Sequence, residues 1–249
     1  MPLHGRGALV TGGSRGIGRT VAQRLAADGA VVVFTYHKHV HDAEALVAEI
    51  AAHGGHSFAV PLDVSDPAQF TTAYETVDDH FRRAAVGLDT VVANAGVFSR
   101  ATITEATVAE WDRVMAINAR GTLLTIQHGI SRLRDNSRII TVSTVGTVWP
   151  SPGEGIYAAS KAAVEQLTRI CSRELGARRI TANTISAGPT DTDLLEANAA
   201  PQELEGAAAM TALGRIGKPA DIANLVALIA HTDSGWMTGQ NIRADGGLS

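Results

Sequence analysis

The stretch that decides the fold lies near the amino terminus, where residues 11–18 read Thr-Gly-Gly-Ser-Arg-Gly-Ile-Gly. The apolar run at residues 8–11 is typical of a buried strand, and the residues after the turn have helical spacing up to Ala27. Glycines in such a turn let the backbone bend sharply and approach an anion, which the free N–H groups of the helix start then face. The sequence therefore predicts a pyrophosphate site at this turn.

Two other interpretations of this turn need to be weighed. Its glycine spacing, G-x-x-x-G-x-G, is a variant of the G-x-G-x-x-G dinucleotide fingerprint, and a tight turn without any ligand is the simpler alternative. A P-loop requires Gly-Lys followed by Ser or Thr, whereas this turn continues as Gly18-Arg19-Thr20.

Short β-branched runs alternate with helical stretches along the whole chain. This alternation predicts βαβ units, and hence a single domain over residues 1–249 with a doubly wound α/β (Rossmann) fold, in which helices cover both faces of a parallel seven-stranded sheet. A long irregular stretch, residues 187–217, is a candidate lid over the substrate. The expected strands are residues 8–11, 31–34, 58–60, 88–93, 138–142, 180–185 and 240–243. The first expected helix follows the glycine turn and ends at Ala27. The other expected helices occupy residues 44–52, 69–83, 107–133 with a break near Gly121, 156–175 and 221–230.

Composition narrows the class of protein. The chain of 249 residues is 45% apolar and 18% charged, with a net charge of −4 and no basic run, so we expect no nucleic-acid partner. No leader and no membrane-length apolar run is evident, which favours a cytoplasmic protein without a membrane partner. Cys171 is the only cysteine.

His37, His39 and His41 alternate in a predicted loop without a matching carboxylate cluster, so we expect no metal site.

The end of the second strand bears on cofactor choice. Dinucleotide sites that prefer NAD place a carboxylate there to hold the ribose 2′-hydroxyl. Here the position holds Tyr36, followed by His37 and Lys38, and Arg15 lies in the glycine turn. These groups suit a 2′-phosphate, which predicts NADP(H) in preference to NAD(H); simple solvation of the charges is the alternative.

A second group of residues indicates catalysis. Tyr157 and Lys161 are four residues apart at the start of a helix, so the phenol and the ammonium share a face. We expect the ammonium to lower the pKa of Tyr157, which then exchanges a proton with an alcohol or carbonyl. Ser143 ends the fifth strand, at the edge where ligands bind in such folds.

With these motifs in place, the chain resembles the short-chain dehydrogenase/reductase family from end to end, and more closely its 3-oxoacyl-thioester reductases and small ketone or sugar-alcohol dehydrogenases. The matching motifs occur in family order: residues 11–18, Asp63-Val64, Asn94-Ala95-Gly96, Asn118, Ser143, Tyr157 with Lys161, Gly188-Pro189-Thr190, and residues 239–240 with 245–247.

The resemblance implies a role for each residue. Tyr157 would be the general acid/base, Lys161 would contact the nicotinamide ribose, Ser143 would orient the substrate oxygen, and Asn118 would kink its helix and hold a relay water. Asp63 and Val64 would line the adenine, and Thr190 and Thr192 would reach the nicotinamide. The full expected cofactor set is Gly12, Ser14, Arg15, Gly16, Ile17, Gly18, Tyr36, His37, Lys38, Asp63, Val64, Asn94, Ala95, Gly96, Tyr157, Lys161, Gly188, Pro189, Thr190 and Thr192.

The chain departs from the family pattern in three places. Ala187-Gly188 stands where Pro-Gly is usual, and Ala93 replaces a commoner Asn. The segment from Ser143 to Tyr157 is one residue longer than usual, so that counting back from Tyr157 selects Thr144, whereas counting from the strand end selects Ser143. We expect Ser143, with an insertion in the loop at residues 147–155.

The expected function is hydride transfer between NADP(H) and a carbonyl/secondary-alcohol pair. A non-catalytic dinucleotide sensor or scaffold on the same fold is the alternative. The lid at residues 194–213 has no Arg or Lys, which predicts an uncharged, largely apolar small-molecule substrate. The resemblance also implies a homotetramer built on the helices at residues 107–133 and 156–175 and on the last strand.

Overall fold

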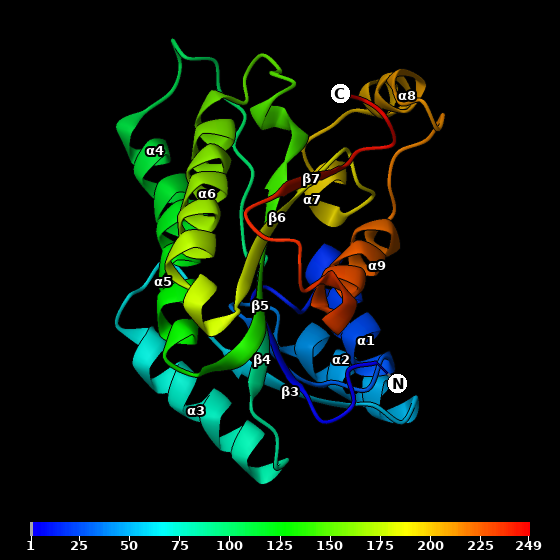
Figure 1. Ribbon diagram of the computed structural model, residues 1–249. Coiled ribbons are helices and arrows are strands. Elements are labelled where there is room, and N and C mark those ends of the chain that lie inside the picture. Colours follow the sequence, from blue (N-terminus) through cyan, green and yellow to red (C-terminus); the bar gives the residue numbers. More distant parts are fainter. Residues whose placement is uncertain (1) are drawn as a thin grey trace.

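The computed structural model describes residues 2–249 and contains one parallel sheet of seven strands, in the order β3-β2-β1-β4-β5-β6-β7 (Figure 1). Helices cover both faces, so the expected doubly wound architecture is confirmed. The strands are β1 (Gly7–Val10), β2 (Val31–Tyr36), β3 (His56–Pro61), β4 (Leu88–Ala93), β5 (Leu133–Thr144), β6 (Thr181–Ala187) and β7 (Asn241–Ala244).

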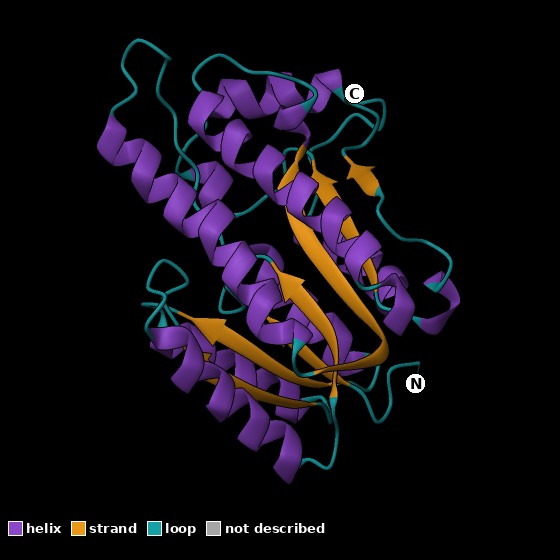
Figure 2. Cartoon of the chain, turned by 60° about the vertical axis from the view of Figure 1, so that its left-hand side comes forward, coloured by secondary structure: helices purple, strands orange, loops and turns teal. Residues whose placement is uncertain are grey.

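The helices form two layers. Those packed on one face of the sheet are α1 (Gly16–Ala27), α2 (Val40–Ala52) and α9 (Pro219–Ala230), and those on the other are α3 (Gln69–Arg83), α4 (Val108–Val114), α5 (Gly121–Ile130) and α6 (Gly155–Glu174) (Figures 1 and 2). Two short helices, α7 (Asp193–Glu196) and α8 (Pro201–Met210), lie beyond the carboxyl edge of the sheet. Within the described residues, no helix is long and apolar enough to cross a membrane.

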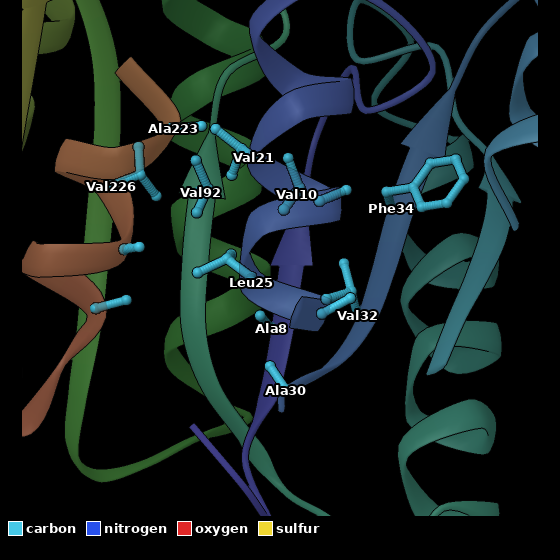
Figure 3. Packing of buried hydrophobic residues seen from close by; sticks show 14 of the residues in the cluster. Ala8, Val10, Val21, Leu25, Ala30, Val32, Phe34, Val92, Ala223 and Val226 are labelled. Carbon is cyan, nitrogen blue, oxygen red and sulfur yellow. The ribbon is translucent and has the colours of Figure 1, made fainter. Parts of the chain in front are cut away.

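A core lies under each helix layer. Figure 3 shows the first, in which Val21 and Leu25 of α1 pack between the strand residues Val10 and Val92 and the α9 residue Val226. All five side chains have no exposed surface. This packing explains the continuous apolar strands, because a central strand of a parallel sheet is buried on both faces.

The sheet reverses its winding direction at β1. Its neighbours are β2 on one side and β4 on the other, so the connections after β1 and β4 leave in opposite directions. Such a switch point leaves a crevice at the carboxyl ends of the strands. The glycine-rich turn follows β1 and therefore lies at this crevice.

The glycines of that turn are required by geometry. Gly12 has φ +66°, a left-handed conformation that favours glycine. A Cβ on Gly18 would lie 2.2 Å from the main-chain oxygen of Gly12, so only glycine lets α1 begin this close to the strand end.

Several bounds differ from their sequence-based predictions, for example α2, which begins at Val40 and not at Glu44, and three of the differences lie in segments near the cavity or in the central strands. The expected break near Gly121 is a π-helical segment, Met115–Arg120, between α4 and α5. Strand β5 begins at Leu133, five residues earlier than expected, because an irregularity in its pairing with β4 accommodates a polar stretch without strand periodicity. The segment at residues 187–217 is not wholly irregular: α7 begins after Thr192, whose side chain accepts from Leu195 N, and α8 begins with Pro201.

Candidate active site

A cavity of about 1020 Å³ opens at the carboxyl edge of the sheet. It runs from the glycine turn past the ends of β2, β4, β5 and β6 to the start of α6 and to helices α7 and α8. Every expected cofactor residue lines it, as do Ser143, Tyr157 and Lys161. Asn118 is the exception among the expected site residues, since it is fully buried behind the wall.

The glycine turn makes a cradle for an anion. No side chain caps the amino terminus of α1, so its first N–H groups are open toward the cavity. The Asn94 amide Nδ2 donates to the main-chain oxygens of Thr11, at 3.0 Å, and Gly12, at 3.2 Å. Asn94 thereby holds the turn against the end of β4. Uncapped donors on a rigid glycine turn fit a dinucleotide pyrophosphate.

Cations gather at the β2 end of the cavity. Tyr36 is half-buried, and the exposed residues His37 and Lys38 follow it. His37 Nε2 lies 3.4 Å from Asp63 Oδ2. Burial raises the pKa of Asp63, but hydrogen bonds from Ser65 and the charges of His37 and Lys38 outweigh burial and hold this pKa below its usual value. No carboxylate occupies position 36 itself, which leaves this end open to an anionic group.

The alternating histidines do not converge. His39 pairs with Asp42 and His41 with Glu44, while His37 faces Asp63. Over residues 2–249, no cluster of three or more His, Cys, Asp or Glu side chains could hold a metal ion.

Tyr157 and Lys161 occupy the first two turns of α6. Lys161 is 5% exposed, its Nζ donates to the Val142 oxygen at 2.9 Å, and this atom lies 6.0 Å from the centre of the Tyr157 ring. Burial and the charge of Glu154 raise the pKa of Tyr157 to about 12, although a hydrogen bond with Thr144 acts in the opposite direction. The expected lowering by Lys161 is therefore not found in the cofactor-free protein, because burial and Glu154 dominate.

Lys161 responds to the same burial with the opposite sign. Burial lowers the pKa of Lys161 to about 8, although the Glu165 carboxylate acts in the opposite direction. A buried ammonium loses solvation, and the single hydrogen bond to Val142 O only partly replaces it.

The hydroxyl beside Tyr157 belongs to Thr144 and not to Ser143. Ser143 Oγ donates to Glu165 Oε1 at 2.6 Å, which turns it toward the middle of α6. Thr144, the last residue of β5, is the residue whose hydroxyl lowers the pKa of Tyr157, which places it beside the phenol. Successive strand side chains point to opposite faces, so one of the two faces Tyr157. Counting back from Tyr157 agrees with this geometry, whereas the expected choice of Ser143 does not.

Asn118 lies within the π-helical segment and supports the cavity from behind. Its Oδ1 accepts from Val97 N at 2.8 Å, and its Nδ2 donates to Val97 O at 2.9 Å and to Ser160 Oγ at 3.0 Å. These bonds tie α6 to the loop after β4. Lys161 Nζ is adjacent, since it and Asn118 Oδ1 both lie 3.2 Å from the point where a Cβ on Gly96 would stand.

Comparison with known proteins shows which family the chain belongs to. The family model described as enoyl-(acyl carrier protein) reductase matches residues 12–249. An uncharacterized oxidoreductase of Methylorubrum extorquens is 38% identical, covering 99% of this chain and 98% of its own length. The chain belongs to the short-chain dehydrogenase/reductase family.

Two other similar proteins have more informative names. The hydroxynaphthalene reductase-like protein Arp2 of Metarhizium majus is 37% identical, over 98% of this chain and 95% of its own length. The crystal structure of angucycline C-6 ketoreductase LanV with bound NADP has a TM-score of 0.94 and 36% identity, covering 99% of this chain and 96% of that one. The short-chain dehydrogenase/reductase fold and oxidoreductase class therefore rest on similarity along nearly the whole chain.

Several side chains of this short-chain dehydrogenase/reductase site have no sequence motif to reveal them. The Phe98 ring packs edge-on against Tyr157, with 4.9 Å between ring centres. Arg100 follows in the same loop, and its Nη2 donates to Glu203 Oε1 of α8 at 2.8 Å, which ties α8 to the loop after β4. Glu154 lines the cavity three residues before Tyr157.

Proposed function

We propose that this protein is an NADP(H)-dependent oxidoreductase that transfers a hydride between the nicotinamide and a carbonyl or secondary-alcohol substrate. One observation carries the proposal: a single cavity has an uncapped glycine-rich helix start at one end and the Tyr157–Thr144 hydroxyl pair with Lys161 at the other. Hydroxyls of this kind hold a carbonyl oxygen and exchange a proton with it.

The bound cofactor supplies or accepts the hydride, and the residues of the chain manage the oxygen and its proton. Thr144 and Tyr157 hold the substrate oxygen between their hydroxyls. In reduction, Tyr157 donates its proton to the forming alkoxide, and the Lys161 ammonium stabilises the phenolate that remains. With its pKa above neutral pH, Tyr157 carries the proton that reduction consumes.

The orienting role expected for Ser143 is assigned to Thr144. Ser143 instead donates to Glu165, which also accepts from Thr147 Oγ1 at 2.8 Å. This group of hydroxyls surrounds the carboxylate that supports the charge of Lys161.

NADP(H) is proposed over NAD(H) because Arg15 and Lys38 flank the end of the cavity where Tyr36 replaces a carboxylate. Arg15 Nη1 lies 3.9 Å from Asp193 Oδ2, a half-exposed contact weak enough to exchange for a phosphate. LanV, which shares the fold, holds NADP in its crystal structure. We further propose a homotetramer and an uncharged small-molecule substrate.

The test is NADPH oxidation with a panel of ketones and diones, together with calorimetric titration of NADPH. Turnover of neutral ketones supports the proposal. Tight binding of NADPH without turnover of any carbonyl would instead support a dinucleotide sensor. Activity confined to anionic substrates would contradict the substrate class.

A further inference from the structure

Glu154 places a carboxylate at the reacting end of the cavity, and the proposed reaction gives it no role. It precedes α6 and lines the cavity. A Cβ on Gly146 would lie 3.2 Å from Glu154 Oε2 and 3.4 Å from Thr144 Oγ1. The carboxylate is therefore a close neighbour of the hydroxyl pair formed by Thr144 and Tyr157.

This carboxylate has no protein partner. Among residues 2–249, no side chain or backbone N–H makes a hydrogen bond or an ion pair with it. The cation whose charge acts on it is Arg100. Arg100, however, is already bound to Glu203 Oε1 and to the Asn198 main-chain oxygen, at 2.8 and 3.0 Å.

Partial burial makes the missing donor costly. Glu154 is half-buried, and burial raises its pKa while Arg100 opposes that shift. A carboxylate that has left part of its water shell without gaining a donor is under-satisfied, so a ligand that brings a donor gains binding free energy.

The surroundings define which donor is suitable. An ionised carboxylate only accepts hydrogen bonds, so the complementary group is an O–H or an N–H. Charges of both signs line the cavity, among them those of Arg100, Glu154 and Glu203, so neither a cationic nor an anionic ligand is favoured. Phe98, whose ring packs against Tyr157, and Trp149 add apolar surface to the lining of the cavity. A neutral hydroxyl on an apolar skeleton satisfies all of these conditions.

We propose that Glu154 is a specificity-determining residue that accepts a hydrogen bond from a hydroxyl on the carbon next to the reacting carbonyl. The substrate is then an uncharged α-hydroxy ketone, or the corresponding diol in the oxidative direction. This inference rests on the proposed function and narrows its substrate class. A site that hydrogen-bonds a substrate hydroxyl also discriminates strongly against the analogue that lacks it.

The experiment compares two ketones of nearly the same shape, α-hydroxyacetophenone and propiophenone, in which a hydroxyl and a methyl group exchange places. The kcat/KM ratio of the two is measured with NADPH for the wild type, Glu154→Gln and Glu154→Leu. Comparing ratios between variants removes the difference in intrinsic reactivity of the two ketones. We expect the ratio to fall several-fold in Glu154→Gln and about tenfold or more in Glu154→Leu, as for loss of a hydrogen bond to a charged group. Glu174→Gln, an exposed position near the end of α6, is the matched control and should leave the ratio unchanged.

The outcomes separate the two proposals. An unchanged ratio in both Glu154 variants overturns the role of Glu154 and leaves the reductase in place. Failure of the wild type to reduce any ketone of the panel overturns the reductase instead. If a variant turns over neither ketone, the dissociation constants of both ketones are measured by calorimetry on the NADP-bound wild type and variant, and their ratio replaces the ratio of kcat/KM. Weaker binding of the hydroxy ketone alone supports the proposal. Equal losses for both ketones contradict it.

Discussion

At the scale of single residues, burial penalises the charged forms of the two central side chains. It holds Tyr157 neutral, with a pKa of about 12, and makes the charged form of Lys161 costly, with a pKa of about 8. Two predictions follow from this pair.

Tyr157→Phe should abolish nearly all turnover and leave NADPH binding almost intact, because it removes the proton donor and little else. General-acid catalysis typically contributes about 10²- to 10⁴-fold, so we expect a loss of at least about 100-fold in kcat. Initial rates and calorimetric titration of NADPH measure the two effects. Tyr74→Phe is the matched control, since that hydroxyl binds the Thr125 oxygen away from the cavity. Near-normal turnover in Tyr157→Phe would show that Tyr157 is not the proton donor.

Lys161→Met should inactivate the enzyme and yet stabilise the cofactor-free protein at neutral pH. A folded-state pKa of about 8, against the ordinary 10.5, corresponds to a penalty of about 3 kcal/mol on the charged lysine. Loss of the hydrogen bond to Val142 offsets about 1 kcal/mol of the gain, which leaves about 2 kcal/mol.

The pH dependence of this effect has a definite sign. Below pH 8 the lysine is charged in both the folded and unfolded states, so the wild type carries the whole penalty. Between pH 8 and 10.5 the folded protein releases the proton while the unfolded chain keeps it, and the penalty disappears. Urea unfolding at pH 7 and pH 10, at one protein concentration, should show the advantage of Lys161→Met at pH 7 only. An equal difference at both pH values would refute this account.

At the scale of elements, the start of α1 is the feature with most consequence for the cofactor. Its N–H groups are uncapped, and the side chain of Arg15 at the cap position is half-exposed beside the cavity. The helix thus brings partial positive charge, and Arg15 brings a full one, to the end of the site where Tyr36 replaces a carboxylate.

Arg15→Ala should raise KM for NADPH by about tenfold and change KM for NADH little, since a charge-assisted bond to phosphate is worth about 1.5 kcal/mol or more. Tyr36→Asp should shift preference toward NADH through repulsion of the 2′-phosphate. The measurement is kcat/KM for both cofactors at one ionic strength. Arg19→Ala is the control, because Arg19 lies one turn further along α1 and pairs with Glu49. A wild type that prefers NADH would contradict this view of Arg15 and Tyr36.

At the scale of the whole molecule, large apolar side chains remain on the surface of the single chain. Trp236 is fully exposed just before the edge strand β7, and Leu228 on α9 is 66% exposed. Leu123 on α5 and Ile170 on α6 are also exposed, at 43% and 47%. Apolar faces of this kind are typical of subunit interfaces.

Light scattering should therefore give a mass of four times the 26.0 kDa chain at micromolar concentration. Trp236→Asp should shift the distribution toward smaller species, because it places a charge where an apolar contact is expected. Val40→Asp on α2, away from these faces, is the control substitution. A monomer across micromolar concentrations would refute the tetramer.

The amino-acid sequence by itself determined the order of strands and helices and the place of the cofactor turn. Local signals suffice there, because glycine favours the left-handed conformation of the turn and a continuous β-branched run suits a strand that is covered on both faces. The predicted bounds of α3 and β4 match the structure residue for residue, and the cavity is lined by every cofactor residue that the motifs indicated.

Only the tertiary structure decided which side chains face one another. The direction of Ser143 depends on Glu165, and the pKa of Tyr157 depends on burial and on Glu154. The contact of Arg100 with Glu203 joins residues 103 positions apart. These features arise from packing between elements that are distant in the chain. A shift of one residue along β5 would exchange Thr144, whose hydroxyl faces the cavity, for Ser143, whose hydroxyl faces α6. Sequence spacing left that choice open, because counting from the strand end selects Ser143 and counting back from Tyr157 selects Thr144, and both residues carry a hydroxyl.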